Sequence, residues 1–202
     1  MTTVQENKIL TDTVEVENAT LIELLEGAST HSSKDKSLHS LNSVQLEGEG
    51  AGYLVARATD RYRLIEGKIE VEHGQLSPSL ISLVDVKRVI ELAKSNKVSR
   101  VSLNRIGDLL TVSVSGSSIT VQLLDANYPK TFDDLLNKSE GEPSPITGVA
   151  FNPALMADYA KIAGKGAAIK LYFTGENKPM RVRITSDTIN WRALLMPMSY
   201  KD

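Results

Sequence analysis

The chain is organised around Ala58-Thr59-Asp60-Arg61-Tyr62-Arg63-Leu64. This stretch follows a strand-like run at residues 53–57, and it places an aspartate and two arginines on a turn before apolar character resumes. A companion stretch, Leu194-Leu195-Met196-Pro197-Met198, lies near the other end of the sequence. Pro197 has no backbone N–H for a sheet ladder, so it belongs on an edge or at a strand end. Each stretch therefore sets apolar side chains beside residues that do not fit easily into the middle of a sheet.

The composition is that of an ordinary globular protein. Of 202 residues, 41% are hydrophobic and 24% are charged, which allows one or two domains. The sequence has no apolar run near the roughly 18 residues that span a bilayer, and its N-terminus does not resemble a secretory signal. We therefore expect a cytoplasmic protein without membrane contact. The net charge of −2 does not by itself indicate a nucleic-acid-binding protein.

Metal and disulfide chemistry is not expected. Cysteine is absent, which excludes disulfides and thiolate metal sites. The three histidines, His31, His39 and His73, have polar neighbours and lack the spacing of metal ligands. We expect all three to be solvent-exposed side chains on loops.

Three helix-start signals recur at an equal interval. Asn18, Asp85 and Asn152 each precede an apolar run, and successive signals are 67 residues apart. Asn and Asp are strong N-caps because their side-chain oxygens accept an orphan backbone N–H, and Pro153 suits the first helical position. Each expected helix carries an apolar stripe at helical spacing. The stripes are Leu21, Leu24, Leu25 and Ala28; Val86, Val89, Ile90 and Ala93; and Met156, Tyr159, Ala160 and Ala163.

A short strand is predicted before each helix, and three more follow it. The preceding strands are 13–16, 79–83 and 147–151, and the following ones are 41–47, 53–58, 63–71, 98–104, 109–114, 118–124, 168–173, 180–185 and 190–196. Turns that contain glycine separate many of them. The chain thus contains three copies of a β-α-β-β-β unit. This repeat predicts an α+β fold with its helices on one face of antiparallel sheets.

The unit count predicts the domains. One unit of this size cannot bury enough apolar surface alone, whereas two can form a two-layer core. We expect residues 1–126, units one and two, to form a complete domain, and residues 127–146, rich in proline and charge, to form a linker. Residues 147–202, unit three, are then half a domain. Its face at Met156, Tyr159 and Ala160 must be covered by another copy or another protein.

Enzymatic motifs are not found. The sequence has no glycine-rich phosphate loop, nucleophile elbow or zinc motif, and Gly164-Lys165-Gly166 is typical of a helix end. We expect no catalytic residue, no cofactor and no metal. Basic side chains on the second and third helices are DNA-facing candidates, although a mixed charged face is more often simply solvated, and phosphate contacts of this kind are non-specific and salt-dependent. They are Lys87, Arg88, Lys94, Lys161 and Lys165.

The motifs and their order resemble the bacterial sliding clamp, the β subunit of DNA polymerase III. Residues 59–64 match the family's Thr-Asp-x-x-Arg-Leu turn, and residues 196–198 match its Met-Pro-Met. Further matches are residues 41–44, 89–92, 125–129, Leu135-Leu136, Phe151-Asn152-Pro153, 173–175 and Lys178-Pro179. Units one and two are similar to the family's middle domain, and unit three to the second half of its last domain. The resemblance implies the DNA-clamp fold in a shortened member of the family.

The resemblance also implies a function. The family forms a ring around duplex DNA, with its helices toward the hole, and binds peptides of the Gln-Leu-x-Leu-Phe type from polymerases, clamp loaders and other partners. The implied role is a DNA-replication processivity factor, nucleoid-associated in a cell or in the host cytoplasm if virus-encoded. The implied peptide pocket is Leu41, Thr59, Arg61, Tyr62, Arg63, Leu64, Pro129, Asn152, Leu155, Leu195, Met196, Pro197 and Met198. For the two methionines, simple core packing is the alternative.

Three departures from the family leave the function open. Arg61-Tyr62 replaces the family's Gly-His, Ser199–Asp202 follows Met-Pro-Met, and the chain has three units instead of six. A family ring holds twelve units, so we expect a homo-oligomer, with a ring-like tetramer favoured over a dimer that pairs two copies of unit three. The alternative function is a non-encircling adaptor or decoy that captures clamp-binding replication proteins. An unrelated enzyme on the same fold is the third reading.

Overall fold

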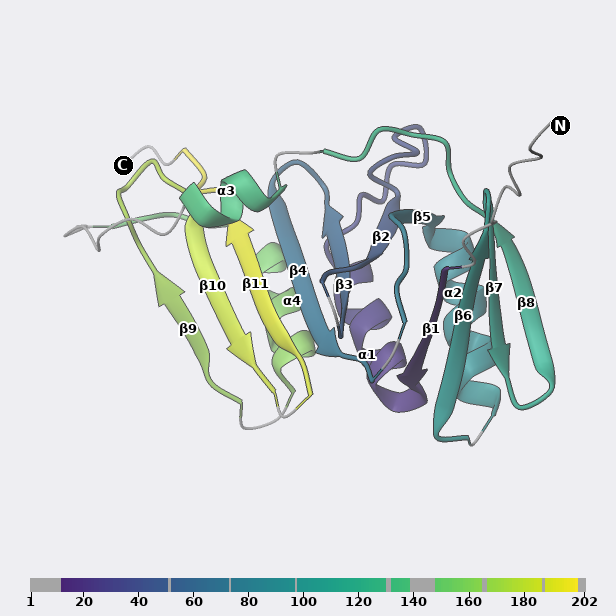
Figure 1. The fold of residues 1–202 in the computed structure, drawn as a ribbon. Coiled ribbons are helices and arrows are strands. Elements are labelled where there is room, and N and C mark those ends of the chain that lie inside the picture. The colour runs from purple at the N-terminus through teal and green to yellow at the C-terminus, as the bar shows by residue number, and fades with distance from the viewer. Residues whose placement is uncertain are drawn as a thin grey trace, which may run out of the picture.

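The computed structural model describes residues 12–50, 52–72, 74–96, 98–129, 132–138, 148–164, 167–186 and 188–199, except for the side chain of residue 133. Its elements follow one another along the chain as Figure 1 shows. They are β1 (Asp12–Glu17), α1 (Asn18–Ser29), β2 (Ser43–Gly48), β3 (Tyr53–Thr59), β4 (Arg63–Glu70), β5 (Ser79–Ser82), α2 (Leu83–Ser95), β6 (Arg100–Ile106), β7 (Leu109–Val114), β8 (Ser117–Gln122), α3 (Phe132–Lys138), α4 (Pro153–Ala163), β9 (Ile169–Tyr172), β10 (Met180–Thr185) and β11 (Asn190–Leu195).

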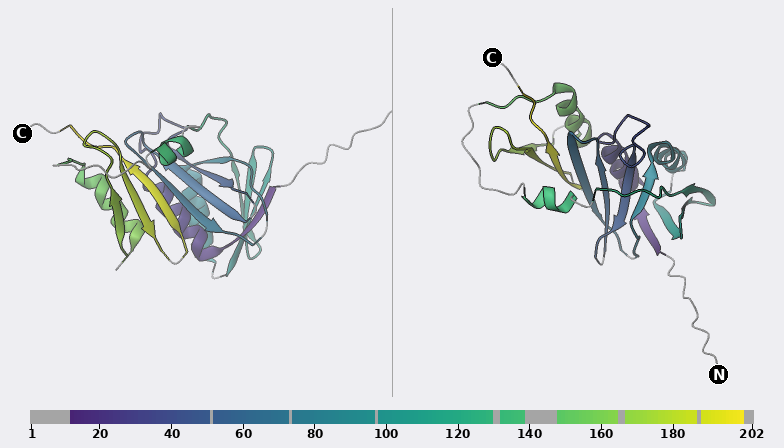
Figure 2. Two further views of the ribbon diagram at one scale, coloured as in Figure 1. Left: turned by 60° about the vertical axis from the view of Figure 1, so that its left-hand side comes forward. Right: turned by 90° about the horizontal axis from the view of Figure 1, so that it is seen from above.

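The strands form two antiparallel sheets. One has the order β1-β6-β7-β8, and the other has the order β5-β2-β3-β4-β11-β10-β9. Helices α1, α2 and α4 lie behind the sheets, whereas the short α3 lies on the opposite face, as the view from above in Figure 2 makes plain. The predicted α+β architecture, with the three repeated helices on one face, is therefore confirmed.

Units one and two exchange strands. The strand before each helix joins the sheet of the other unit, so β1 pairs with β6 and β5 pairs with β2. Helices α1 and α2 pack against each other behind this exchange, and their predicted stripes, Leu21 to Ala28 and Val86 to Ala93, are buried. The exchange explains why two units form one core: each sheet is completed by a strand of the other unit.

Unit three is joined to unit one through the sheet. Strand β11 pairs with β4 and places Leu194 opposite Leu64. Behind this joint the Trp191 indole, 1% exposed, packs between Gly27 and Gly67. A Cβ on these glycines would lie 2.5 and 2.4 Å from carbons of the indole ring. The joint therefore requires glycine at both positions.

The end of α1 packs against α4, and this contact corrects two predictions. His31 is fully buried and its ring lies 5.2 Å from that of Tyr159, so the prediction that it is solvent-exposed is wrong. Tyr159 is 1% exposed, so the prediction that it lies on the uncovered face of unit three is wrong as well. Ala160 is exposed and Met156 is half-buried.

The predicted helix starts hold for one helix of three. Asn152 caps α4 by accepting a hydrogen bond from Ala154 N at 2.9 Å. Helix α2 is capped by Ser82, whose hydroxyl accepts from Asp85 N, so Asp85 lies in the first turn. Asn18 lies inside α1, and its side-chain amide donates to Ala93 O and Asn96 O at the end of α2. The Asn18 side chain thus makes a tertiary contact with α2 instead of capping α1.

Two predicted segments differ from the structure. Helix α3, Phe132–Lys138, lies where only a linker was predicted. Residue 147 lies outside the described residues, and the rest of the predicted 147–151 strand makes one bridge, between Ala150 and Met198. The division into domains stays a prediction.

Candidate functional site

An apolar groove opens beside the 59–64 turn on the face that carries α3. Its volume is about 280 Å³. Leu64 and Leu194 form its floor as a cross-strand pair, and they are 6% and 4% exposed. Tyr62, Leu135 and Met196 form its rim and are 67%, 46% and 44% exposed. The full lining is Leu41, Thr59, Arg61, Tyr62, Arg63, Leu64, Pro129, Phe132, Leu135, Pro179, Leu194 and Met196.

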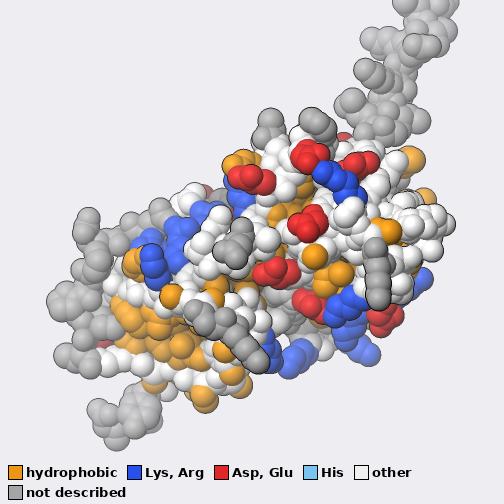
Figure 3. Space-filling view, turned by 90° about the horizontal axis from the view of Figure 1, so that it is seen from below, with side chains coloured by type: hydrophobic (Ala, Val, Ile, Leu, Met, Phe, Trp, Pro, Cys, Tyr) orange, Lys and Arg blue, Asp and Glu red, His pale blue; other side chains and the backbone are white. Residues whose placement is uncertain are grey.

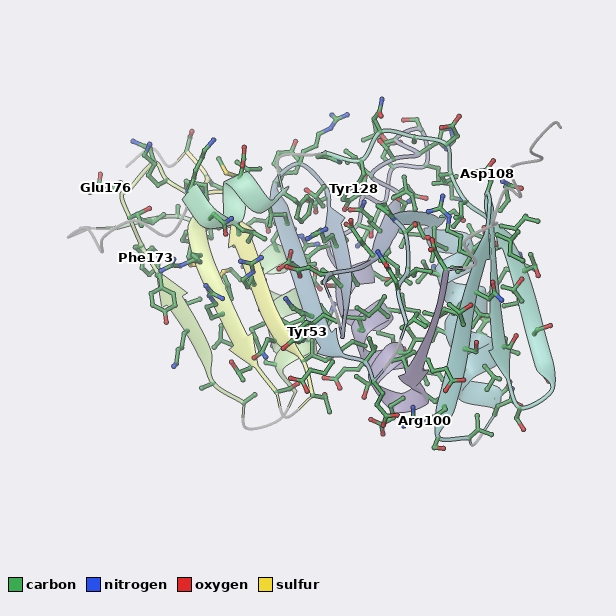
Figure 4. The ribbon with its side chains drawn as sticks, in the orientation of Figure 1. Tyr53, Arg100, Asp108, Tyr128, Phe173 and Glu176 are labelled. Carbon is green, nitrogen blue, oxygen red and sulfur yellow. The ribbon has the colours of Figure 1, made fainter. Side chains whose placement is uncertain are left out.

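A second, smaller core lies beneath the groove. Phe132 of α3 stacks on Tyr128, with ring centroids 5.6 Å apart, and both pack with Leu64, Leu80, Leu136 and Leu194. Tyr128 is labelled in Figure 4 beside the upper ends of β3 and β4, close to α3. Burial raises the pKa of the Tyr128 hydroxyl above its usual value. This core fixes α3 against the sheet and so fixes one wall of the groove.

The turn on the other wall is held by its own residues. Asp60 Oδ1 accepts hydrogen bonds from Tyr62 N and Arg63 N, each at 3.1 Å, and Thr59 Oγ1 donates to Arg63 O at 2.7 Å. Arg61 adopts a φ of 80°, a region that suits glycine better than other residues. The resulting turn presents Tyr62 outward, and Tyr62 O accepts from Met196 N at 2.9 Å.

Arg63 ties the turn to two helices from beneath. Its guanidinium donates to Asp60, to Asp158 of α4 at 2.7 Å, and to Thr30 O at the end of α1 at 2.7 Å. Burial acts to raise the pKa of Asp158, but hydrogen bonds from Lys161 and Arg63 hold that pKa below its usual value. Arg63 is 5% exposed and uses its donors on its own chain, so its role in the groove is to position the turn.

The structure brings most of the predicted pocket residues together. Eight of them line the groove: Leu41, Thr59, Arg61, Tyr62, Arg63, Leu64, Pro129 and Met196. Five do not line it. Asn152 caps α4, Leu195 is fully buried in the main core, Leu155 and Pro197 are half-buried, and Met198 is 53% exposed.

Sequence reasoning missed four lining residues: Phe132, Leu135, Leu194 and Pro179. The first two belong to α3, and the signal that could have found them is the helical spacing of Phe132, Leu135 and Leu136. Pro179 belongs to a stretch that carried the resemblance, and Leu194 belongs to the companion stretch at residues 194–198; neither was assigned to the pocket.

The basic candidates lie on the helix face, but acidic residues balance them. Lys87, Arg88, Lys94 and Lys161 are exposed, and Lys165 lies outside the described residues. Three of the four are in ion pairs: Arg88 with Asp85, Lys94 with Glu26, and Lys161 with Asp158. Across α1, α2 and α4, these four basic residues stand beside five acidic ones, Glu23, Glu26, Asp85, Glu91 and Asp158. The helix face is therefore close to neutral.

Other kinds of site are not found in the described part of the chain. Its histidine and acidic side chains form no group of three or more that could hold a metal ion. Among the same residues, no helix combines the length and apolar character needed to cross a bilayer.

Comparison with known proteins identifies the family. The model of the DNA polymerase III beta subunit, central domain, matches residues 15–130, which is more than half of the chain. The chain belongs to the DNA polymerase III beta subunit family. The predicted resemblance is thereby confirmed, and the match spans β1 to the start of the segment that carries α3.

Relatives agree with this assignment. The beta sliding clamp of Micrococcus luteus is 29% identical over 165 residues, which cover 79% of this chain and 51% of the relative. The chain thus spans about half the length of the curated relative that it matches.

Solved structures show the same fold. The beta subunit of Thermotoga maritima superposes with a TM-score of 0.79 at 18% identity, covering all of this chain and 68% of that one. The sliding clamp of Caulobacter crescentus gives a TM-score of 0.75 at 15% identity, covering 99% and 68% of the two chains. The clamp of Pseudomonas aeruginosa gives 0.75 at 13% identity, covering 94% and 67%.

Proposed function

We propose that this chain is a sliding-clamp-like processivity factor of DNA replication, with no catalytic activity of its own. Its groove would bind peptides of the Gln-Leu-x-Leu-Phe type from a DNA polymerase or clamp loader. The observation that carries the proposal is the apolar groove beside the Thr59–Leu64 turn in a chain of this family. Apolar floor residues with an exposed apolar rim suit the leucine and phenylalanine anchors of such a peptide, because peptide specificity comes from side-chain pockets.

The rim is the part of the groove to test. Met196→Ala and Leu135→Ala are each expected to weaken binding of a Gln-Leu-x-Leu-Phe peptide by roughly 30-fold, since anchor contacts contribute about 2 kcal/mol or more. Both side chains are exposed, so their truncation leaves the cores intact. Isothermal titration calorimetry measures the effect.

Leu109→Ala is the matched control for this experiment. Leu109 is 45% exposed, close to the values for the two rim residues, and lies on β7 away from the groove. It is expected to leave peptide affinity unchanged. Unchanged affinity in both rim variants would remove the groove from the proposal.

The second element of the proposal is an assembly of several chains around duplex DNA, bound non-specifically. A ring-like tetramer is favoured over a dimer by the count of units. In that assembly Lys87, Lys94 and Lys161 would face DNA. The slope of log affinity against log salt is negative, by about one for each lysine–phosphate contact. Reversal of all three to glutamate is then expected to make this slope less steep by about three.

Lys138→Glu is the control for charge alone. Its side chain is 78% exposed on α3, on the opposite face from the other helices, so DNA binding should not change. One observation favours the second candidate, a non-encircling adaptor or decoy: the described helices α1, α2 and α4 together carry four basic and five acidic residues. A chain that binds the peptide but not DNA, with or without the three reversals, would be such an adaptor.

A further inference from the structure

In each unit, one edge of the strand before the helix forms a backbone hydrogen bond with a later segment of the same unit. In unit one Gln75 N donates to Thr13 O, and in unit two Leu124 N donates to Leu80 O at 2.9 Å. The corresponding bond in unit three runs from Met198 N to Ala150 O at 2.8 Å. Residues 148–151, which precede the Asn152 cap, therefore stand where β1 and β5 stand in the other units.

The opposite edge of this strand distinguishes unit three. In units one and two the residue that caps the helix lies opposite the first residue of the other unit's next strand: Glu17 opposite Arg100, and Ser82 opposite Ser43. In unit three the equivalent strand is β9, which ends the seven-stranded sheet. Among the described residues, neither the outer edge of β9 nor that of residues 148–151 pairs with a strand.

The apolar side of β9 is exposed as well as its outer edge. Leu171 is 41% exposed, whereas Leu46 and Leu103, at the corresponding positions of β2 and β6, are each 1% exposed. Four apolar side chains of unit three, Phe151, Met156, Ile169 and Phe173, pack against the main core but are only half-buried. Figure 3 shows hydrophobic side chains gathered at this end of the molecule on its helix side, and Figure 4 shows Phe173 at the outer edge of the sheet.

We propose that this face binds a second copy of the chain about a twofold axis, so that two unit threes complete one domain. A partner that covers this face must supply two strands at once. One is a strand that precedes a helix, to pair with β9, and the other is an unpaired first strand after a helix, to pair with residues 148–151. Unit three of a second copy supplies both. A twofold axis makes the two pairings identical. In units one and two, Leu103 and Leu46 lie opposite Val14 and Ser79, each three residues before the residue that caps the helix. Aligning Leu171 with these leucines sets the register: Val149 of one copy lies opposite Leu171 of the other, Phe151 opposite Ile169, and Asn152 opposite Ala168, the residue before β9.

The register also avoids electrostatic repulsion. Lys170, the charged residue of β9, lies opposite Ala150 of the second copy, so no like charges meet across the strands. The proposal deepens the assembly suggested above but does not depend on DNA or peptide binding.

Native mass is the first test. Wild-type chain at micromolar concentration is expected to have twice the 22.0 kDa mass of one chain, or a higher even multiple, by light scattering. Leu171→Asp should halve that mass and leave peptide affinity unchanged. Leu109→Asp, at a similarly exposed leucine of β7, should leave the mass unchanged.

A disulfide tests the register itself. Leu80 turns its carbonyl away from Gln45 toward Leu124, so Leu80 and Gln45 form the closely spaced kind of pair, with Cα atoms about 4.5 Å apart. Ala150 and Lys170 of two copies would form the equivalent pair, within reach of a disulfide. The natural chain has no cysteine, so no other thiol competes.

Lys170→Cys combined with Ala150→Cys is expected to give a covalent dimer on oxidation. Lys170→Cys combined with Gly148→Cys, two residues out of register, should give little. A monomeric wild-type chain, an unchanged mass for Leu171→Asp, or no covalent dimer from the in-register pair would each overturn the proposal.

Discussion

Gly67→Ala is expected to lower the free energy of unfolding by about 3 kcal/mol, the upper end of what overpacking costs. A Cβ at residue 67 would lie 2.4 Å from Trp191 Cζ3 and 2.8 Å from Leu24 Cδ1. Carbon atoms in contact are about 3.5–4.0 Å apart. Trp191 cannot move aside, because Gly27 also lies against this ring, so closely that a Cβ there would be 2.5 Å from Trp191 Cη2. Urea unfolding followed by tryptophan fluorescence measures the change, since Trp191 is the single tryptophan of the chain.

The control for this experiment is Gly148→Ala. A Cβ at Gly148 would meet nothing within 4 Å, so its stability should match that of the wild type. Gly67→Ala combined with Trp191→Leu should cost less than the sum of the two single changes, because the smaller side chain removes the clash. Equal stability of Gly67→Ala and Gly148→Ala would show that the joint between units one and three tolerates a methyl group.

Strands β7 and β10 were predictable because each lies between turns and alternates apolar and polar residues. The predicted 109–114 and 180–185 match β7 and β10. The spacing of the repeat placed the helices, but it gave the correct capping residue only for α4. Asn18 has the chemistry of an N-cap, and only the folded chain shows that its amide binds the end of α2 instead.

The groove was predictable in part, from the family resemblance and not from spacing. Leu64 and Leu194 belong to the two stretches that stand out in the sequence, and the β4–β11 ladder places them side by side. Helix α3 was not predicted, because its pattern covers less than two turns among prolines and charged residues. Its stability comes from Phe132 and Leu136 packing on the second core, and local sequence does not report such packing.

His31 shows the same limit of local sequence, here for a side chain that was predicted to be exposed and is buried. Thr30, Ser32 and Ser33 surround it in the sequence and favour an exposed loop. In the fold, helix α4 covers this loop, and Tyr159 contacts the imidazole. The neighbour that buries His31 is distant in the sequence, so a prediction from local composition was wrong.

Burial of His31 is expected to make the protein acid-sensitive. Burial lowers the pKa of the imidazole, the charge of Arg63 lowers it as well, and Asp158 acts to raise it; the net effect takes the pKa from 6.5 to about 3. Protonation therefore favours the unfolded chain, whose histidine takes up a proton near pH 6.5. The stability that the neutral imidazole contributes is complete above pH 6.5 and is lost as the pH falls toward about 3. The slope of the loss is about 1.4 kcal/mol per pH unit.

His31→Gln isolates this contribution, since glutamine does not titrate. Between pH 7.5 and 4.5 the wild type should lose about 3 kcal/mol more free energy of unfolding than His31→Gln, measured by urea titration at each pH. The difference between the two proteins removes the loss from carboxylates, including Asp158, whose pKa is also lowered. His39→Gln changes an exposed histidine and should keep the wild-type slope. Because His31 lies between Arg63 and Tyr159, parallel slopes for the wild type and His31→Gln would mean that α4 separates from α1 before the imidazole is protonated.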